Sequence, residues 1–96
     1  QTIGALTITT TAGADSTHTI LHIPEQAPFG MAYVAKSDTG ATSVNYGDAL
    51  TSGWTEVTDG SSFTTASGQT VTVALVNKTK GNIATAVGSA AAVVGS

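Results

Sequence analysis

Residues 69–77 have the sequence QTVTVALVN, and this stretch decides the fold class. Val71, Val73 and Leu75 alternate with two threonines and an alanine. A period of two is typical of a β-strand, because successive side chains point to opposite faces of a sheet. We therefore predict a half-buried strand over these residues, with the three larger side chains on the core face.

Two segments earlier in the chain have strand-like patterns. Thr17–Ile23 places Leu21 and Ile23 on one face, which predicts a strand with that face toward the core. Gly30–Lys36 has apolar side chains at consecutive positions, so this strand is expected to be buried on both faces.

The two end segments are also predicted to be extended. Thr2–Thr10 carries Leu6 and Ile8 on one face. A bulge is expected at Gly4, because the residue before it falls out of phase with that face. Asn82–Val94 is predicted to form one long bent strand or two short strands broken near residue 88, because its valines and glycines disfavour helix.

Turn signals separate these strands. Pro24 and Pro28 bracket a loop, residues 38–40 and 45–47 favour turns, and the Asp-Gly pair at 59–60 is typical of a β-hairpin. About six to eight short strands, with a turn signal roughly every 8–12 residues, predict an all-β fold. We expect an antiparallel β-sandwich or a small barrel.

The composition indicates one small domain with few charges. The chain has 96 residues, of which 41% are hydrophobic and 9% charged, and its net charge is −3. This length predicts a single domain over residues 1–96. Three Lys and no Arg argue against binding to nucleic acid or to an anionic membrane surface. No stretch is long enough for a transmembrane helix, and no Cys supplies a disulfide or a thiolate, so neither membrane insertion nor thiol chemistry is expected.

One motif suggests catalysis. Asp38-Thr39-Gly40 resembles the turn that presents a carboxylate in aspartic proteases, where two such turns share one proton. Lys36 and Ser37 stand where that family has apolar residues, so a plain turn is the preferred interpretation. We therefore expect no enzymatic activity and no catalytic residue.

His18 and His22 have a spacing that would serve a metal on a helix. The segment is predicted to be a strand, in which four residues span roughly 13 Å, too far for both rings to bind one ion. The aspartates of the predicted turns form no spaced calcium-binding pattern. No metal and no cofactor are expected.

The aromatic residues raise the question of a ligand site. Tyr46, Asp48 and Trp54 lie close enough in sequence to form a sugar-binding patch, with aromatic rings stacking on the sugar and a carboxylate accepting hydrogen bonds. A domain with one Trp and two Phe also needs large side chains in its core, and core packing is the preferred interpretation for Trp54. These three residues remain the candidate ligand-binding set, with a surface glycan as the candidate ligand.

A family resemblance is carried by residues 46–50 (YGDAL), 54–55 (WT), 67–73 (SGQTVTV) and 88–90 (GSA). This spacing is similar to that of repeat-type β-sandwich modules of Gram-positive bacterial surface proteins and of phage structural proteins. The resemblance implies an immunoglobulin-like sandwich and a non-catalytic role in display or assembly. It supplies no site residues, and Asn77-Lys78 departs from the acidic residues that the family usually has there.

The small number of charged residues also favours a non-catalytic role in display or assembly. Charged residues, Lys above all, normally protect exposed strand edges, and few are present here. We expect a structural or display module that self-assembles or adheres, with Thr2–Thr10 or Ile83–Val94 docking against an array neighbour. The chain begins at Gln1 rather than Met, which favours a processed or excised protein. The expected location is extracellular, on a cell surface or in a virion, and the alternative function is carbohydrate binding.

Overall fold

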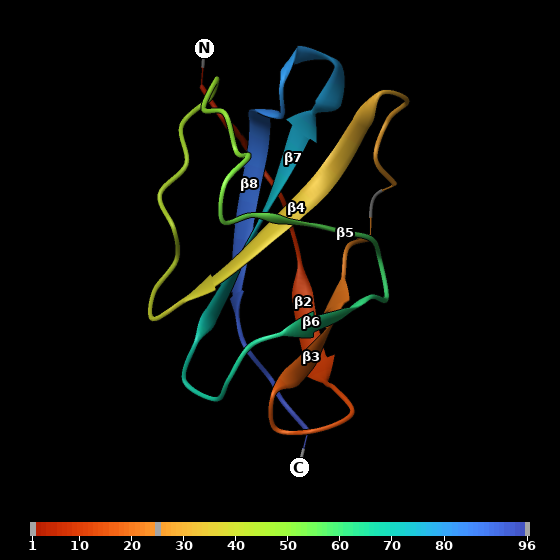
Figure 1. Cartoon of the computed structure of the whole chain (residues 1–96), viewed down its shortest axis with the longest axis vertical. Helices are drawn as coiled ribbons and strands as arrows, with labels where there is room; N and C mark the ends of the chain where they lie inside the picture. The colour runs from red at the N-terminus through yellow and green to blue at the C-terminus, as the bar shows by residue number, and fades with distance from the viewer. Residues whose placement is uncertain (1, 25, 96) are drawn as a thin grey trace.

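The structure, a computed structural model, describes residues 2–24 and 26–95, and within them the chain forms two packed β-sheets. In Figure 1 the strands of the smaller sheet are grouped in the lower part of the view. The five-stranded sheet has the order β1 (Gly4–Ala5), β8 (Ile83–Ala91), β7 (Thr70–Asn77), β4 (Met31–Asp38), β5 (Thr55–Val57). The three-stranded sheet has the order β2 (Thr9–Ala12), β3 (His18–His22), β6 (Ser62–Thr64). The predicted all-β sandwich is confirmed.

The connections give the sandwich its immunoglobulin-like topology. Strands β7 and β8 form a hairpin through the short 3-10 helix η1 (Lys78–Lys80), and β4 and β5 belong to the same sheet. The links from β3 to β4, from β5 to β6 and from β6 to β7 each cross between the sheets. Crossings of this kind are typical of immunoglobulin-like sandwiches, in which sequence neighbours alternate between two sheets.

Strand β7 lies at the centre of the larger sheet, as its alternating sequence predicts. It pairs with β4 from Thr70 to Asn77 and with β8 along the same length. Its Val71 and Val73 face the smaller sheet and are fully buried. The core between the sheets also contains buried side chains from both sheets and their connections: Ile8, Leu21, Ile23, Tyr33, Ala35, Val57 and Phe63.

The prediction that β7 is half-buried is wrong, because its second face is covered as well. Residues 39–54, which we term the covering loop, place Val44 and Leu50 against Ala74 and Val76 of β7 in a second apolar cluster. The Thr72 hydroxyl on this face is buried and accepts a hydrogen bond from the Thr42 N–H at 2.9 Å. The two-sided burial predicted for β4 is confirmed, with Val34 in the same outer cluster.

The N-terminal segment forms two strands rather than the predicted single strand with a bulge. Gly4 and Ala5 pair in parallel with β8, and the chain then crosses so that Thr9–Ala12 pairs with β3. Between them the Leu6 N–H donates to the Val87 carbonyl at 2.9 Å. Both end segments thus have partners inside the chain, with β1 and β2 at sheet edges, and the expectation that one of them docks against a neighbour stays a prediction.

Close approach of this segment explains a glycine in β8. A Cβ on Gly88 would collide with the Leu6 carbonyl oxygen, so only glycine fits beneath the crossing chain. Strand β8 nevertheless continues unbroken from Ile83 to Ala91, with one extra residue at Thr85 opposite the Leu75/Val76 step of β7. The long bent strand is therefore the alternative that the structure confirms.

The Asp-Gly pair at 59–60 forms a turn, but the hairpin predicted there is wrong. The Ser61 N–H donates to the Thr58 carbonyl at 3.1 Å, and Gly60 has the positive φ that such a turn requires. The strands on either side belong to different sheets, because β5 pairs with β4 and β6 pairs with β3. A local turn signal does not tell which strand each arm will pair with.

Candidate functional site

Tyr46 and Asp48 lie in a turn of the covering loop that is tied to β8. The Asp48 carboxylate accepts from the Asn45 N–H at 2.9 Å, and the Ala84 N–H donates to the Asp48 carbonyl at 2.8 Å. The Tyr46 side chain is 38% exposed, so its ring is partly available at the surface. Hydrogen bonds hold the turn that presents this ring, and the Asp48 carboxylate is already engaged in one of them.

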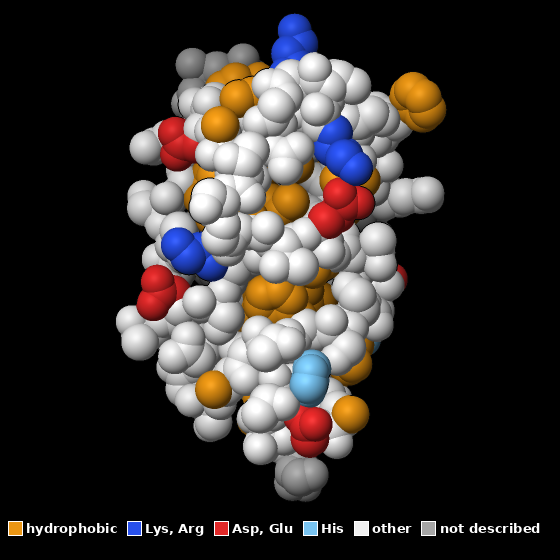
Figure 2. Space-filling model, viewed as in Figure 1, with side chains coloured by type: hydrophobic (Ala, Val, Ile, Leu, Met, Phe, Trp, Pro, Cys, Tyr) orange, Lys and Arg blue, Asp and Glu red, His pale blue; other side chains and the backbone are white. Residues whose placement is uncertain are grey.

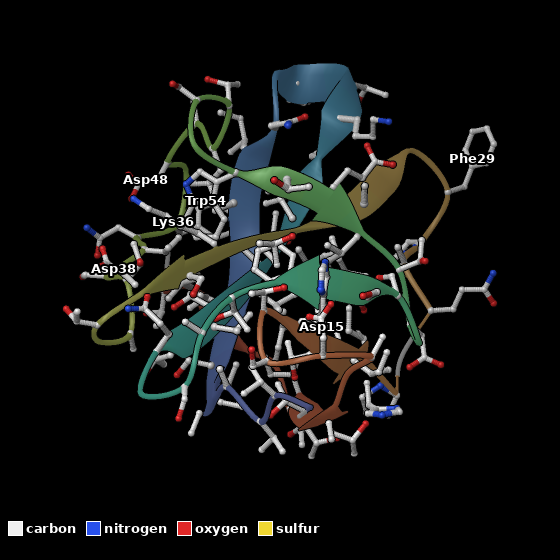
Figure 3. All side chains as sticks on the ribbon, turned by 60° about the horizontal axis from the view of Figure 1, so that its bottom comes forward. Asp15, Phe29, Lys36, Asp38, Asp48 and Trp54 are labelled. Atoms are coloured by element: carbon white, nitrogen blue, oxygen red, sulfur yellow. The ribbon has the colours of Figure 1, made fainter. Side chains whose placement is uncertain are left out.

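Trp54 lies at the other end of the covering loop and packs against the outer apolar cluster. This cluster contains Val34 and Leu50, and the Trp54 side chain is half-buried. Figure 3 shows Trp54 and Asp48 on the same side of the molecule, together with Lys36 and Asp38. The core-packing interpretation thus describes Trp54 well, and a flat sugar platform would have to use its remaining exposed edge.

Asp38, the candidate catalytic carboxylate, is exposed at the end of β4. Its Oδ1 accepts from the Thr39 N–H at 2.7 Å, which is the behaviour of a carboxylate that stabilises a turn. This contact agrees with the plain turn preferred for Asp38 and Thr39, and the absence of catalysis stays a prediction.

The two histidines stand at the two ends of β3 and have different partners. His18 Nδ1 lies 2.7 Å from Asp15 Oδ1, and His22 Nε2 lies 2.7 Å from the Thr11 hydroxyl. Among residues 2–24 and 26–95, no three His, Asp or Glu side chains come together in a way that would hold a metal ion. The histidines are surface groups that tie strands and turns together.

Asp15 is the most heavily hydrogen-bonded carboxylate of the described chain. Its Oδ1 accepts from the Thr17 hydroxyl at 2.6 Å, from His18 Nδ1 and from the Thr17 N–H at 2.9 Å. These bonds favour the ionised form and hold the pKa of Asp15 well below its usual range. They fix the turn between β2 and β3, where the Gly95 N–H also donates to the Asp15 carbonyl at 2.9 Å.

A cavity lies elsewhere in the described part of the chain, beside the link from β3 to β4. Its volume is about 490 Å³, and Glu56 and Asp59 stand at its wall. The apolar part of the wall comes from Ile23, Pro24, Ala27, Met31, Tyr33 and Val57. We term this space the Val57 cavity. It opens because β5 covers β4 only at residues 33–35 and leaves the start of β4 without a neighbour on that side.

Phe29 lies on the same β3–β4 link and is the most exposed large apolar side chain among the described residues, at 107% of its reference accessibility. The Met31 N–H donates to the Pro28 carbonyl at 3.0 Å, which closes a turn with Phe29 and Gly30 at its centre. Gly30 has φ +79°, as the third position of a type II turn requires. Figure 3 shows the Phe29 ring pointing away from the body of the molecule.

A shallower groove of about 230 Å³ lies between the facing edges of β5 and β6, lined by Val57 and Phe63 and by neighbouring polar residues. Figure 2 shows apolar side chains in a hollow at this place. The groove and the Val57 cavity share Glu56 and Val57 in their walls.

Sequence reasoning missed the Val57 cavity and the display of Phe29. The proline-bracketed loop was recognisable, and a Phe followed by Gly at its end was the available signal of an outward turn. The cavity wall joins residues from three separate parts of the chain, and only the strand order brings these together.

Comparison with known protein families, with curated protein sequences and with solved structures finds no match for this chain. None of the helical segments in the described part of the chain is long and apolar enough to cross a membrane.

Proposed function

We propose that this domain is a non-catalytic structural or display module of a phage virion or a bacterial cell surface, and that it acts by self-assembly or adhesion. The observation that carries the proposal is the lack of charge at the sheet edges. Of the edge strands in the described chain, β1, β2 and β6 carry no charged side chain. The Glu56 carboxylate of β5 is paired with Lys78 Nζ at 3.0 Å. Little repulsion therefore opposes the approach of another protein surface.

The edges are also short, between two and four residues each, which limits how many backbone hydrogen bonds an added strand can form. Contact through side chains must therefore contribute much of the affinity. A module of this kind binds weakly as a single copy and firmly in an array, because many weak contacts act together.

Light scattering coupled to size-exclusion chromatography tests the proposal. The expected result is a rise in average mass above the 9.5 kDa of one chain as the protein is concentrated from micromolar to millimolar. A mass that stays at one chain over this range, with no binding to intact virions or bacterial cells of the source, would contradict the proposal.

The alternative function is carbohydrate binding through Tyr46, Asp48 and Trp54. The observation in its favour is that the Tyr46 ring is partly exposed on a turn held by hydrogen bonds. A glycan array with the native chain, Tyr46→Ala and Trp54→Ala tests it. Binding that both substitutions abolish in folded protein supports the alternative, whereas no binding, or binding that neither substitution changes, removes it.

A further inference from the structure

Phe29 is presented rigidly, as expected of a residue that contacts a partner. The turn that contains it is fixed on one side by the Met31 N–H bond to the Pro28 carbonyl. On the other side the Lys78 N–H donates to the Gly30 carbonyl at 3.1 Å. Because these bonds hold the backbone of the turn, an interface has to order only the side-chain rotamers of Phe29. Aromatic side chains of this kind dominate the energetics of protein interfaces.

The Val57 cavity has the size and chemistry to receive such a ring. Cavities of roughly 300–1,000 Å³ accommodate small ligands, and this one measures about 490 Å³. Its wall combines polar side chains with an apolar part, in which the half-buried Met31 and Ala27 lie beside the buried Tyr33 and Val57. A phenyl ring would remove apolar surface from water on both partners.

Charges around the two features are complementary. Helix η1 packs beside Gly30, where Thr79 Cγ2 would lie 3.6 Å from an added Cβ, and it carries the exposed Lys78 and Lys80. The Val57 cavity carries Glu56 and Asp59 at its wall. Lys78 and Glu56 already pair at 3.0 Å within one chain. A second copy that brings its Phe29 to this cavity therefore brings the Lys80 ammonium toward the Asp59 carboxylate, which favours the encounter.

The position of both features on one link sets the symmetry of the contact. Residues 23–24, 26–27 and 31 line the cavity, and Phe29 projects from the same stretch. A twofold axis beside this stretch brings each Phe29 over the cavity of the other copy, so that the same surface of both copies forms the contact.

From these features we infer that two copies of this chain dimerise by reciprocal insertion of Phe29 into the Val57 cavity of the partner copy. The inference rests on the proposed function, because it names the surface through which the domain self-assembles. The contact is centred on one loop and is smaller than a standard interface, so its affinity as an isolated dimer is weak.

Two substitutions at the surface separate the two halves of this contact. Phe29→Ala removes the inserted ring and leaves the cavity intact. Thr58→Arg places a long side chain at the cavity wall and leaves Phe29 intact, and the turn is retained because Thr58 contributes only its backbone to the bonds with Ser61. Tyr46→Ala is the matched control, because it removes the other exposed aromatic ring of the described chain from a distant loop.

Sedimentation equilibrium of these variants, with circular dichroism to confirm folding, tests the inference. We expect Phe29→Ala and Thr58→Arg each to weaken dimerisation by about 30-fold or more, and Tyr46→Ala to change it less than about 2-fold. Mixing the two impaired variants is expected to restore part of the association, because the cavity of one accepts the Phe29 of the other.

Each other outcome overturns the inference in a recognisable way. If Phe29→Ala dimerises as tightly as the native chain, the inference is overturned and the proposed function is left standing. A native chain that stays monomeric at millimolar concentration overturns it, and virion or cell binding then decides the proposed function. Association that Phe29→Ala abolishes but that the mixture does not restore rejects reciprocal insertion.

Discussion

The covering loop packs on the outer face of the five-stranded sheet, whereas the β3–β4 link runs from one sheet to the other. The two segments differ in how they place their apolar side chains. The covering loop buries Val44 and Leu50 against the outer face of β4 and β7. The β3–β4 link leaves Phe29 fully exposed and stands beside a cavity of about 490 Å³. One loop completes the core, and the other presents the surface that we propose for association, so the proposal assigns stability and association to different loops.

The sharpest test of this separation compares Leu50→Ala with Phe29→Ala. Leu50 is 6% exposed and its truncation leaves space in the outer cluster, so we expect a loss of about 2–4 kcal/mol in the free energy of unfolding. Phe29→Ala removes a side chain that touches little in the monomer, and a change below about 0.5 kcal/mol is expected. Urea unfolding of dilute protein measures both. Equal losses for the two variants would break the distinction between the loops.

Substitution of Asp59 tests how the start of the β3–β4 link is held in place. Its Oδ1 accepts from the Ile23 N–H at 2.8 Å, where β3 leads into the link that carries Phe29. Asp59→Ala leaves this part-buried N–H without its acceptor and is expected to cost about 1–2 kcal/mol in unfolding free energy. Asp59→Asn keeps an oxygen acceptor and serves as the control. A loss as large in Asp59→Asn as in Asp59→Ala would show that this hydrogen bond is not the cause.

Thr72 tests how the covering loop is attached. Thr72→Val keeps the shape of the buried side chain but removes the hydroxyl that accepts from the Thr42 N–H. The expected cost is about 1 kcal/mol in unfolding free energy, together with faster hydrogen exchange at the Thr42 amide. Unchanged exchange at Thr42 would contradict an anchoring role for this bond.

The smallest effect is expected at the β2–β3 turn, which belongs to neither loop. Because hydrogen bonds lower the pKa of Asp15 in the folded state, its contribution to stability is complete above its ordinary value of 3.8. This contribution is lost as the pH falls below that value toward the lowered folded pKa. The stability difference between native protein and Asp15→Asn, measured by thermal unfolding, is expected to shrink over the same acidic range. A difference that grows on acidification would contradict the sign of the shift.

Periodic strands could be predicted from sequence because their pattern is local. The alternation of Val71, Val73 and Leu75 identified β7, and the consecutive apolar residues of β4 indicated burial on both faces. The covering of the Thr72 face of β7 could not be predicted, because it depends on a loop about 30 residues earlier. Threonines that alternate with valines indicate that one face of the strand is polar. The bond from the Thr42 N–H to the Thr72 hydroxyl, which accompanies the covering of this face, cannot be recognised from the local sequence.

The candidate site was harder to predict than the fold. Tyr46 and Trp54 were selected as candidates because aromatic residues are scarce in this sequence. Trp54 packs against the outer apolar cluster, in agreement with the core-packing interpretation preferred for it. Their role in binding a ligand stays a prediction. Phe29 was equally visible in the sequence, but its exposure depends on a turn and on a bond from Lys78, and the cavity beside it depends on how far β5 extends along β4.

Amide chemical shifts, recorded by NMR as the protein is concentrated from micromolar to millimolar, test most directly that the β3–β4 link is the association surface. The predicted result is a set of concentration-dependent shifts at Ile23, Ala27, Phe29 and Val57, with the amides of the covering loop unchanged. Shifts confined to the covering loop, or shifts that persist in full in Phe29→Ala, would contradict the account.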